Sequence, residues 1–288
     1  MKKRVLCTGI TSSHLWPAFC ELQKRDDIEL FGIKPPKAKD PSGPRIFSAS
    51  FSDPEAIKLI FHDVQPTHVL HAAGICDLDA SESNPDWTHQ INVIGTRLIR
   101  GLSENIYFMY CSADLVFSGV NPPENGYAED SQPNPVSIVG KTMAMAEKEV
   151  SIHKNFSILR VGLPMGDSVQ GYKGPIDWIE NRFKRGLPVT LFYDEYRSAI
   201  HTDEIGKMIT ELFLKEVQGI FHVGGPEPVS LYQMGQVISE YSPAYDKNLL
   251  KGRFTREEKN GPPRVINIHM DSSKTYQTLG WKARKWPD

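Results

Sequence analysis

The sequence predicts an α/β protein, in which a doubly wound parallel sheet of the Rossmann type carries a smaller mixed α/β lobe on its C-terminal side. Short apolar runs alternate with segments of helical period as far as Val161. The runs are continuously apolar, which is typical of parallel strands covered on both faces. After Gly162 the regular alternation of apolar runs and helical segments ends, and glycine and proline become frequent.

Five apolar runs predict the strands of this sheet, and four segments of helical period predict the helices between them. In the first helix Leu15, Phe19 and Leu22 recur at helical spacing, and Asp53 can cap the second helix. We expect strands at 5–9, 28–33, 67–74 (strand, then turn), 106–111 and 156–161, and helices at 13–25, 53–62, 87–102 and 137–153.

The later part of the chain predicts the smaller lobe, with helices at 176–185, 203–217 and 231–241. We expect residues 1–161 to form the dinucleotide-binding-type domain, to which 198–223 returns, and 162–197 with 224–288 to form the lobe. Ligands of such folds lie in the crevice at the carboxyl edge of the sheet. The lobe is therefore expected to close a ligand site.

Composition excludes several classes of protein. The 288 residues are 40% hydrophobic and 24% charged with a formal net charge of −2, which argues against a nucleic-acid or anionic-lipid partner. No apolar run approaches the ~20 residues that span a bilayer, and the start does not resemble a signal peptide, so we expect a cytoplasmic protein. The cysteines have no metal-ligand spacing, which predicts free thiols and no metal: Cys7, Cys20, Cys76 and Cys111.

The turn after the first strand is a weak dinucleotide motif. Such a turn needs glycines so that the backbone can approach a pyrophosphate and the helix can pack on the strand. Only Gly9 remains of a Gly-x-x-Gly-x-x-Gly spacing, because Ser12 and Leu15 occupy the other two positions. Thr11 and His14 complete this turn. It fits either a phosphate-binding loop or an ordinary helix start with a hydroxyl cap.

The end of the second strand bears on the choice between NAD and NADP. An acid here would bind the ribose of NAD, but the strand ends without one and Lys34 and Lys37 follow. If a dinucleotide binds, these lysines favour the 2′-phosphorylated form. The alternative is a solvated basic loop.

Most of the chain resembles the extended short-chain dehydrogenase/reductase superfamily, and in particular its dTDP-4-dehydrorhamnose reductase branch. The order and spacing of several stretches carry the resemblance: 71–74, 79–85, 91–96, 111–119, 127–130, 133–135, 159–161, 197–204 and 271–282. The resemblance implies an NADPH- or NADH-dependent step on a nucleotide-linked sugar, with a serine or threonine, a tyrosine and a lysine doing the proton work. It also implies cofactor contacts from Ala72, Ala73, Gly74 and Asn92.

The sequence departs from this family at all three catalytic positions. Alignment on Pro135 and on Ala146-Glu147 places Ala113, Val139 and Met143 where the family has threonine, tyrosine and lysine. None of these can donate a proton or carry charge. Ser137 and Lys141 have the same spacing two residues earlier, but two residues rotate a helix by about 200°. The usual catalytic groups are thus unassigned in this chain.

Other polar residues are expected near the carboxyl edge and are candidates for substrate contacts. Ser112 and Asp114 flank Ala113, and Cys76 and Asp79 follow the strand at 67–71. Arg160 fits either a phosphate contact or a structural salt bridge. The last candidate for a substrate contact is Arg197.

Three functions stay open on the sequence. The protein could bind a nucleotide sugar or similar metabolite without the standard machinery, as an enzyme of unusual design. It could be a non-catalytic member, as is the regulatory subunit of methionine adenosyltransferase that this branch includes, and serve a partner enzyme or form a homodimer. It could also be an NADPH-dependent reductase or epimerase that uses other residues.

Overall fold

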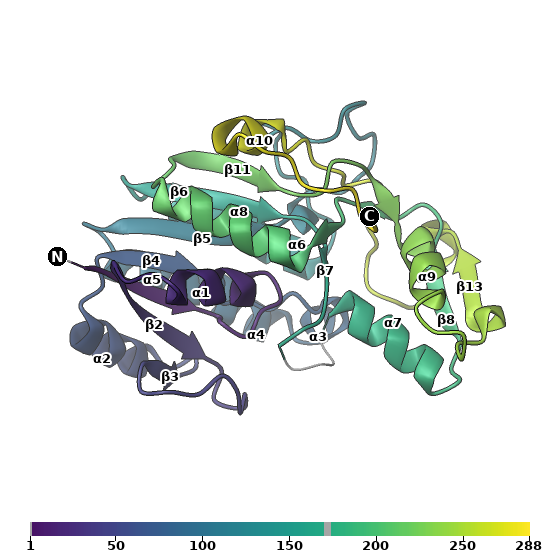
Figure 1. The fold of residues 1–288 in the computed structure, drawn as a ribbon. Helices are drawn as coiled ribbons and strands as arrows, with labels where there is room; N and C mark the ends of the chain where they lie inside the picture. The colour runs from purple at the N-terminus through teal and green to yellow at the C-terminus, as the bar shows by residue number, and fades with distance from the viewer. Residues whose placement is uncertain (1, 170–173) are drawn as a thin grey trace.

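Seven parallel strands form one sheet in the computed structural model, which describes residues 2–169 and 174–288 (Figure 1). The strand order is β11-β6-β5-β4-β1-β2-β3, so the chain runs outward from β1 in both directions. This is the doubly wound arrangement that the sequence predicts. The strands are β1 (Lys3–Thr8), β2 (Ile28–Lys34), β3 (Ile46–Ser48), β4 (His68–His71), β5 (Tyr107–Ala113), β6 (Phe156–Val161) and β11 (Gly219–Val223).

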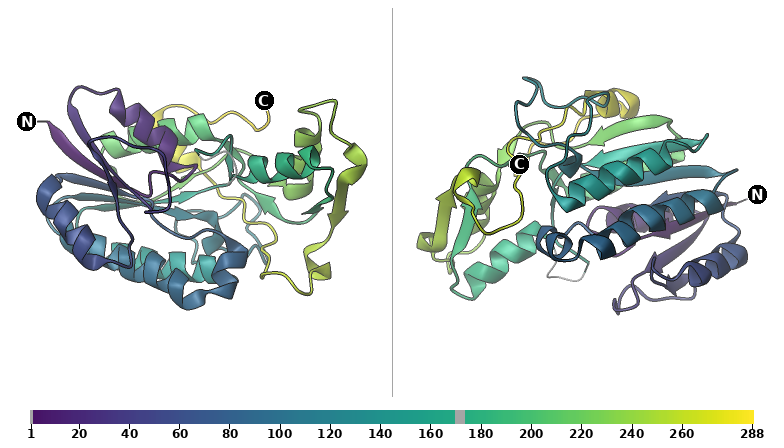
Figure 2. Two further views of the ribbon diagram at one scale, coloured as in Figure 1. Left: turned by 90° about the horizontal axis from the view of Figure 1, so that it is seen from below. Right: turned by 180° about the vertical axis from the view of Figure 1, so that it is seen from behind.

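Helices cover both faces of the sheet, as the continuously apolar strands require (Figure 2). One face carries α1 (Leu15–Gln23) and α8 (Thr202–Leu214), and the other carries α2 (Pro54–Val64), α5 (Thr96–Leu102) and α6 (Ile138–Val150). A Cβ on Gly206 would lie 2.5 Å from the Pro17 Cβ, so α1 and α8 pack closely. The last helix, α10 (Ser273–Leu279), lies beside β11 (Figure 1).

The helix expected at 87–102 is interrupted. It consists of α4 (Pro85–His89), a π-helical stretch at Gln90–Gly95, and α5. Single π turns often occur at functional sites, and this one contains Asn92. A short helix that the sequence did not predict, α3 (Leu78–Ser83), precedes it and begins with the side chain of Asp77 accepting the Ala80 N–H.

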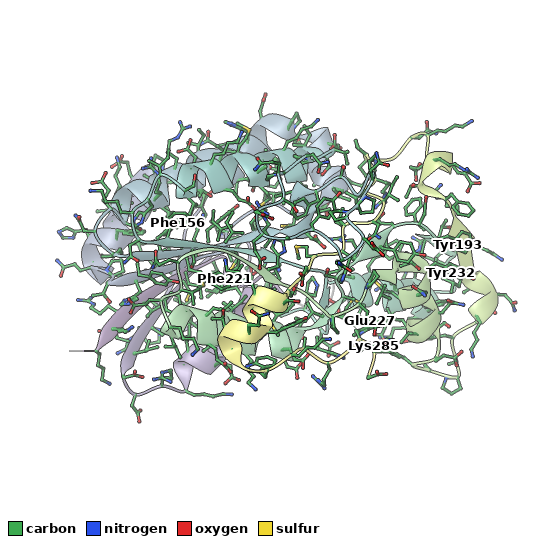
Figure 3. All side chains as sticks on the ribbon, turned by 90° about the horizontal axis from the view of Figure 1, so that it is seen from above. Phe156, Tyr193, Phe221, Glu227, Tyr232 and Lys285 are labelled. Carbon is green, nitrogen blue, oxygen red and sulfur yellow. The ribbon has the colours of Figure 1, made fainter. Side chains whose placement is uncertain are left out.

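The smaller lobe has its own apolar core, which includes Phe183, Leu191, Met234 and Trp286. Tyr193 and Tyr232 pack against each other on it, and Lys285 of the C-terminal segment pairs with Glu227 at 2.6 Å (Figure 3). The elements after β6 are β7 (Pro164–Met165), α7 (Pro175–Lys184), β8 (Val189–Phe192), β9 (Tyr196–Arg197), β10 (Ile200–His201), β12 (Val229–Ser230), α9 (Leu231–Ser239) and β13 (Leu250–Arg253).

The chain leaves the sheet after β6 and returns to it through α8 and β11, which fall within the predicted return at 198–223. The exact domain boundaries stay a prediction. In the part of the chain that the structure describes, no helix is both long and apolar enough to cross a bilayer.

Candidate nucleotide-sugar site

The turn between β1 and α1 keeps one feature of a phosphate loop. Gly9 has φ +73°, and a Cβ there would lie 2.6 Å from the backbone of Ala72 and Ala73, so only glycine fits. The next two positions differ from a phosphate loop. Ser12 Oγ accepts the Leu15 N–H at 3.2 Å, and the Leu15 side chain is fully buried in the core. One N–H that could face a phosphate is therefore already used.

His14 and Thr11 lie half-buried at the same turn. Burial lowers the pKa of His14 to about 4, so its ring is neutral at pH 7. The Nδ1 of His14 has no hydrogen-bond partner among the described residues. Across the turn, Lys34 Nζ donates to the carbonyl of Lys39 at 2.5 Å. Lys34 and Lys37 are the two lysines expected to favour NADP. The contact with Lys39 occupies one donor of Lys34, whereas Lys37 is exposed.

Asn92 fixes the loop after β4. Its Oδ1 accepts the Ile75 N–H at 2.7 Å, and its Nδ2 donates to the Ile75 carbonyl at 3.1 Å and to Thr142 Oγ1 at 2.9 Å. Ala72 and Ala73 are buried, whereas Gly74 is exposed. Asn92 is 1% exposed and acts here by holding this loop, not through a free amide.

The three family catalytic positions are apolar and offer no proton donor. Val139 is 0% exposed and Met143 is 3% exposed on α6, while Ala113 ends β5. The Met143 Cε would lie 3.0 Å from a Cβ on Gly74, which brings the methionine beside the exposed glycine. The space around Gly74 is therefore lined by a thioether where the family has an ammonium.

Ser137 and Lys141 do not replace the missing pair. Ser137 is the N-cap of α6, and its Oγ accepts the Gly140 N–H at 3.1 Å. Lys141 is exposed on the outside of the same helix. This agrees with the rotation expected from the two-residue offset.

Ser112 and Arg160 belong to a buried network in the sheet. Arg160 Nη2 donates to Glu147 Oε2 at 2.9 Å, and Ser112 Oγ donates to Glu147 Oε1 at 2.6 Å. All three side chains are buried, and Arg160 also lies over the Phe117 ring at 5.0 Å. Their polar groups already have partners, so we assign them to the core and do not retain them as substrate contacts.

Asp114 and Arg197 form a bidentate ion pair between the sheet and the lobe. Arg197 Nε donates to Asp114 Oδ2 at 2.8 Å and Arg197 Nη2 donates to Oδ1 at 2.5 Å. Cys76 is exposed as a residue, but its thiol is largely desolvated. Burial, and to a smaller extent the Asp114 carboxylate, raises its pKa to about 11. Three of the predicted substrate residues therefore meet here, while Asp79 is exposed in the first turn of α3.

Glu195 and Arg264 extend this cluster, and sequence reasoning did not single them out. Glu195 is 1% exposed, and its Oε1 lies 3.8 Å from Arg197 Nη1. Its Oε2 lies 3.7 Å from Arg264 Nη1. These distances are too long for hydrogen bonds. Glu195 and Arg197 lie in one segment, while Asp114 and Arg264 come from two distant ones, so no local motif predicts the cluster.

These residues do not fit the nicotinamide end of a dinucleotide. At the two positions where the resemblance implies contacts with a nicotinamide ribose, this chain has Met143 and Val139, which can neither donate a hydrogen bond nor supply a proton. The Gly9 turn fits a close backbone approach by phosphate, but Ser12 and Leu15 reduce its free N–H groups. No hydride step is derived for this chain.

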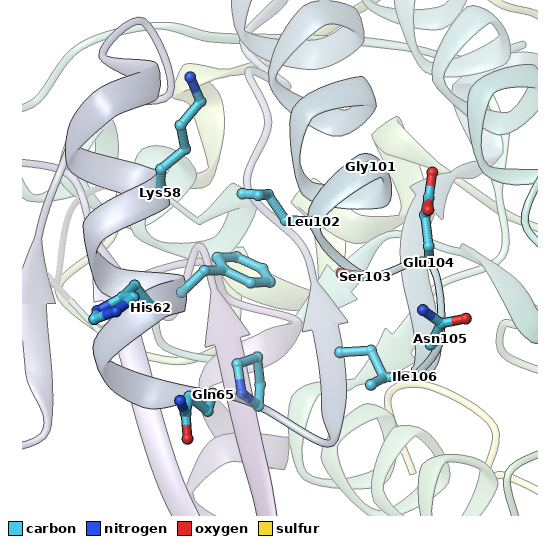
Figure 4. Close-up of a pocket in the computed structure, with 11 residues that line it drawn as sticks. Lys58, His62, Gln65, Gly101, Leu102, Ser103, Glu104, Asn105 and Ile106 are labelled. Atoms are coloured by element: carbon cyan, nitrogen blue, oxygen red, sulfur yellow. The ribbon is translucent and has the colours of Figure 1, made fainter.

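Two grooves lie away from this cluster. One lies at the amino edge of the sheet, between the end of α2 and the turn before β5, with Leu102 and Ile106 among its walls and Lys58 and His62 on its rim (Figure 4). The other lies beside α10 and includes His269. Neither contains a residue predicted for the site. Within residues 2–169 and 174–288, no group of three His, Cys, Asp or Glu side chains could hold a metal ion.

The fold and the site define the class as a doubly wound scaffold of the extended short-chain dehydrogenase/reductase type, with apolar residues at the catalytic positions. The chain belongs to the family described as the RmlD substrate binding domain, which it matches over residues 4–288. This confirms the resemblance inferred from the sequence.

The chain is similar to several known proteins. It is 25% identical over 281 residues to methionine adenosyltransferase 2 subunit beta of Xenopus laevis, covering 94% of this chain and 81% of that protein. Its fold matches dTDP-4-dehydrorhamnose reductase from Bacillus anthracis in complex with NADP, with TM-score 0.82, 20% identity and coverage of 99% and 96%. It also matches the Bordetella bronchiseptica enzyme WbmG in complex with NAD and UDP, with TM-score 0.79, 21% identity and coverage of 99% and 90%.

Proposed function

We propose that this protein binds a nucleotide-linked sugar or a similar metabolite at the carboxyl edge of the sheet and does not perform hydride transfer with a tyrosine and lysine pair. The absence of such hydride transfer is inferred from Val139 and Met143, which are buried where the family has its tyrosine and lysine. Neither side chain can protonate an alkoxide or lower the pKa of a phenol. This arrangement supports a function other than that of an ordinary reductase.

The cluster beside Asp114 supports an anionic ligand. The Arg197 side chain is 10% exposed and the Arg264 side chain is 24% exposed, so solvent reaches both. The Arg264 Nε–H is buried and has no partner among the described residues, the guanidinium lies over the Phe192 ring at 4.8 Å, and the contact of its Nη1 with Glu195 is longer than a hydrogen bond. Guanidinium groups suit phosphate oxygens, and the crevice at this edge is where doubly wound folds bind ligands.

NADP or NAD is proposed as a second ligand that would not donate hydride. The Gly9 turn would approach its diphosphate, and Lys37 lies exposed beyond the end of β2. In reductases of this type the bound dinucleotide supplies the redox chemistry. In this chain Val139 and Met143 would contribute no hydrogen bond to its nicotinamide end.

Titration calorimetry tests this function with UDP-glucose, dTDP-glucose, NADP and NAD. We expect a nucleotide sugar to bind, and Arg264→Gln to weaken it roughly tenfold to a hundredfold, because each hydrogen bond to a charged group contributes about 1.5–3 kcal/mol. Arg185→Gln, on the exposed end of α7, is the control and should bind as the wild type does. Absence of binding by every nucleotide, or full affinity in Arg264→Gln, would overturn the proposal.

The second candidate function is that of a subunit that serves a partner enzyme. Its support is that the similarity to a protein named as a subunit of methionine adenosyltransferase spans 94% of this chain. Size-exclusion chromatography of the purified protein, alone and mixed with a purified methionine adenosyltransferase, tests it. A joint peak supports the subunit role, a lone peak of twice the chain mass supports a homodimer, and two separate peaks contradict the subunit role.

A further inference from the structure

We propose that Glu195 takes up a proton when an anionic diphosphate binds beside Arg197 and Arg264, so that it makes the affinity of this site depend on pH. The inference rests on the proposed nucleotide-sugar function, because it names how that site would admit its charged ligand. It is carried by the placement of one buried carboxyl group between two guanidinium groups.

The Glu195 carboxylate is buried, and its hydrogen-bonding capacity is not fully used. It is 1% exposed, and its Oε2 has no hydrogen-bond partner among the described residues. The two guanidinium groups lie at 3.8 Å and 3.7 Å from its oxygens, close enough for attraction and too far for hydrogen bonds. A buried carboxylate left in this state is costly, so its protonated form is favoured relative to a carboxylate in water.

The backbone holds Glu195 in this position. The Leu231 N–H donates to the Glu195 carbonyl at 3.0 Å, and the Tyr196 N–H donates to the Ile266 carbonyl at 2.7 Å. The second bond ties β9 to the segment that carries Arg264. The carboxyl group therefore stays between the two arginines when the lobe is in this arrangement.

The charges of Arg197, Arg264, Asp114 and Glu195 balance when all four groups are ionised, and Asp194 adds one further negative charge beside them. Arg197 and Arg264 contribute two positive charges, and Asp114 and Glu195 contribute two negative ones. Asp194 also faces the cluster electrostatically, but Thr255 N–H and Oγ1 both donate to its carboxylate at 2.8 Å. With Asp194 counted, protonation of Glu195 changes the net charge of the cluster from −1 to 0, which removes repulsion of an incoming anion.

The electrostatic surroundings move Glu195 toward this protonation. Burial is the largest cause that raises the pKa of Glu195, and the nearby carboxylates raise it further. Arg197 and Arg264 oppose this and lower the pKa of Glu195, which is nevertheless raised overall. The negative charge of a ligand would raise this pKa further. A bound dianion would compete for the same two arginines and repel the carboxylate.

The proton balance follows from this competition. In the free protein, at a pH above the pKa of Glu195, its ionised carboxylate faces the arginines. In the complex the diphosphate takes the guanidinium donors, and one proton from solvent forms an O–H bond on the Glu195 carboxyl group. Between the pKa of Glu195 in the free protein and its higher pKa in the complex, binding takes up as much as one proton. Affinity therefore falls as pH rises through this window.

Calorimetry with UDP-glucose tests the inference on the full chain. The diphosphate of this probe is esterified at both ends and does not titrate near neutral pH, so proton uptake reports the protein. Pipes and Tris release a proton with different enthalpies, so we expect the observed binding enthalpies in the two buffers to differ if binding takes up a proton. We expect the affinity to fall by up to tenfold for each unit of pH increase.

Glu195→Gln imitates the neutral side chain and should remove both effects. We expect it to bind UDP-glucose roughly tenfold more tightly than the wild type at a pH above the window, with no proton uptake. Glu129→Gln is the matched control, because Glu129 also has a raised pKa but accepts the His222 N–H and should retain wild-type behaviour.

The outcomes separate this inference from the proposed function. Binding of UDP-glucose with equal enthalpies in the two buffers, or unchanged or weaker binding by Glu195→Gln, overturns the role of Glu195 alone. Absence of binding by every nucleotide sugar at any pH overturns both proposals. If Glu195→Gln does not fold, the comparison of buffers on the wild-type protein still decides.

Discussion

The Tyr110 hydroxyl donates a hydrogen bond to the Met143 Sδ at 3.1 Å, in the buried space between β5 and α6. Tyr110 is 2% exposed, and burial raises its pKa well above the ordinary value. Its phenol is therefore a neutral group inside the core and cannot stand in for the catalytic tyrosine. Met143 fills the helix position that would carry the lysine, and its sulfur accepts the phenol O–H inside the core.

Met143 should contribute to stability as a core residue does. We expect Met143→Ala to lower the free energy of unfolding by about 2–5 kcal/mol, through lost burial and a residual cavity. Met145, on the same helix but 43% exposed, is the matched control, and Met145→Ala should change stability by roughly 0.5 kcal/mol or less. Urea unfolding of both variants measures this, and equal effects would show that Met143 does not fill a packed site.

The ion pair of Asp114 and Arg197 should also be a structural contact between the sheet and the lobe. Asp114→Ala leaves the Arg197 guanidinium buried without its partner, which should cost about 3–5 kcal/mol in the free energy of unfolding. Asp203→Ala removes a carboxylate that pairs with Arg284 at the surface and should stay close to the wild type. Denaturant unfolding of the two variants distinguishes them. A small effect of Asp114→Ala would mean that water solvates Arg197 in its place.

Much of the fold could be predicted from the sequence because parallel strands buried on both faces are continuously apolar. The five runs and the four intervening helices follow from this and from helical spacing such as Leu15, Phe19 and Leu22. The strand β3 was missed because it has three residues, of which none is fully buried. The π turn at Gln90–Gly95 was missed because the apolar pattern continues through it.

The site was harder to predict because its polar groups meet only in three dimensions. The loss of charge at Val139 and Met143 could be inferred from the aligned positions, and both are buried. Arg160 was open to two interpretations in the sequence, and its partner Glu147 decides for the salt bridge. Glu195 and Arg264 could not be identified from the sequence. Glu195 lies two residues from Arg197, and such a pair in a loop is usually solvated, while Arg264 is far from both in the chain.

His71 should make stability depend on pH. It is fully buried between Thr8 Oγ1, at 2.6 Å, and Thr96 Oγ1, at 3.0 Å. Burial lowers the pKa of His71 from 6.5 to about 3. Between these values the unfolded chain binds a proton that the folded protein does not, so stability is full above pH 6.5 and falls as pH decreases toward 3.

Urea unfolding at pH 7 and pH 5 measures this effect. The wild type should lose about 2 kcal/mol more between these pH values than His71→Asn does, which corresponds to one neutral buried histidine. His62→Asn is the control, because it makes the same substitution at an exposed histidine on α2. Parallel curves for the wild type and His71→Asn would contradict the assignment of the depressed pKa to His71.

The most direct test of the central claim is the steady-state oxidation of NADPH by the purified protein with dTDP-4-keto sugars. With Val139 and Met143 in place of a tyrosine and a lysine, we expect turnover at least about 10²–10⁴-fold below that of an ordinary reductase, because a missing general acid alone costs this much in rate. Turnover of about one per second, which is at the low end for enzymes, and its abolition by Lys141→Ala would contradict the account.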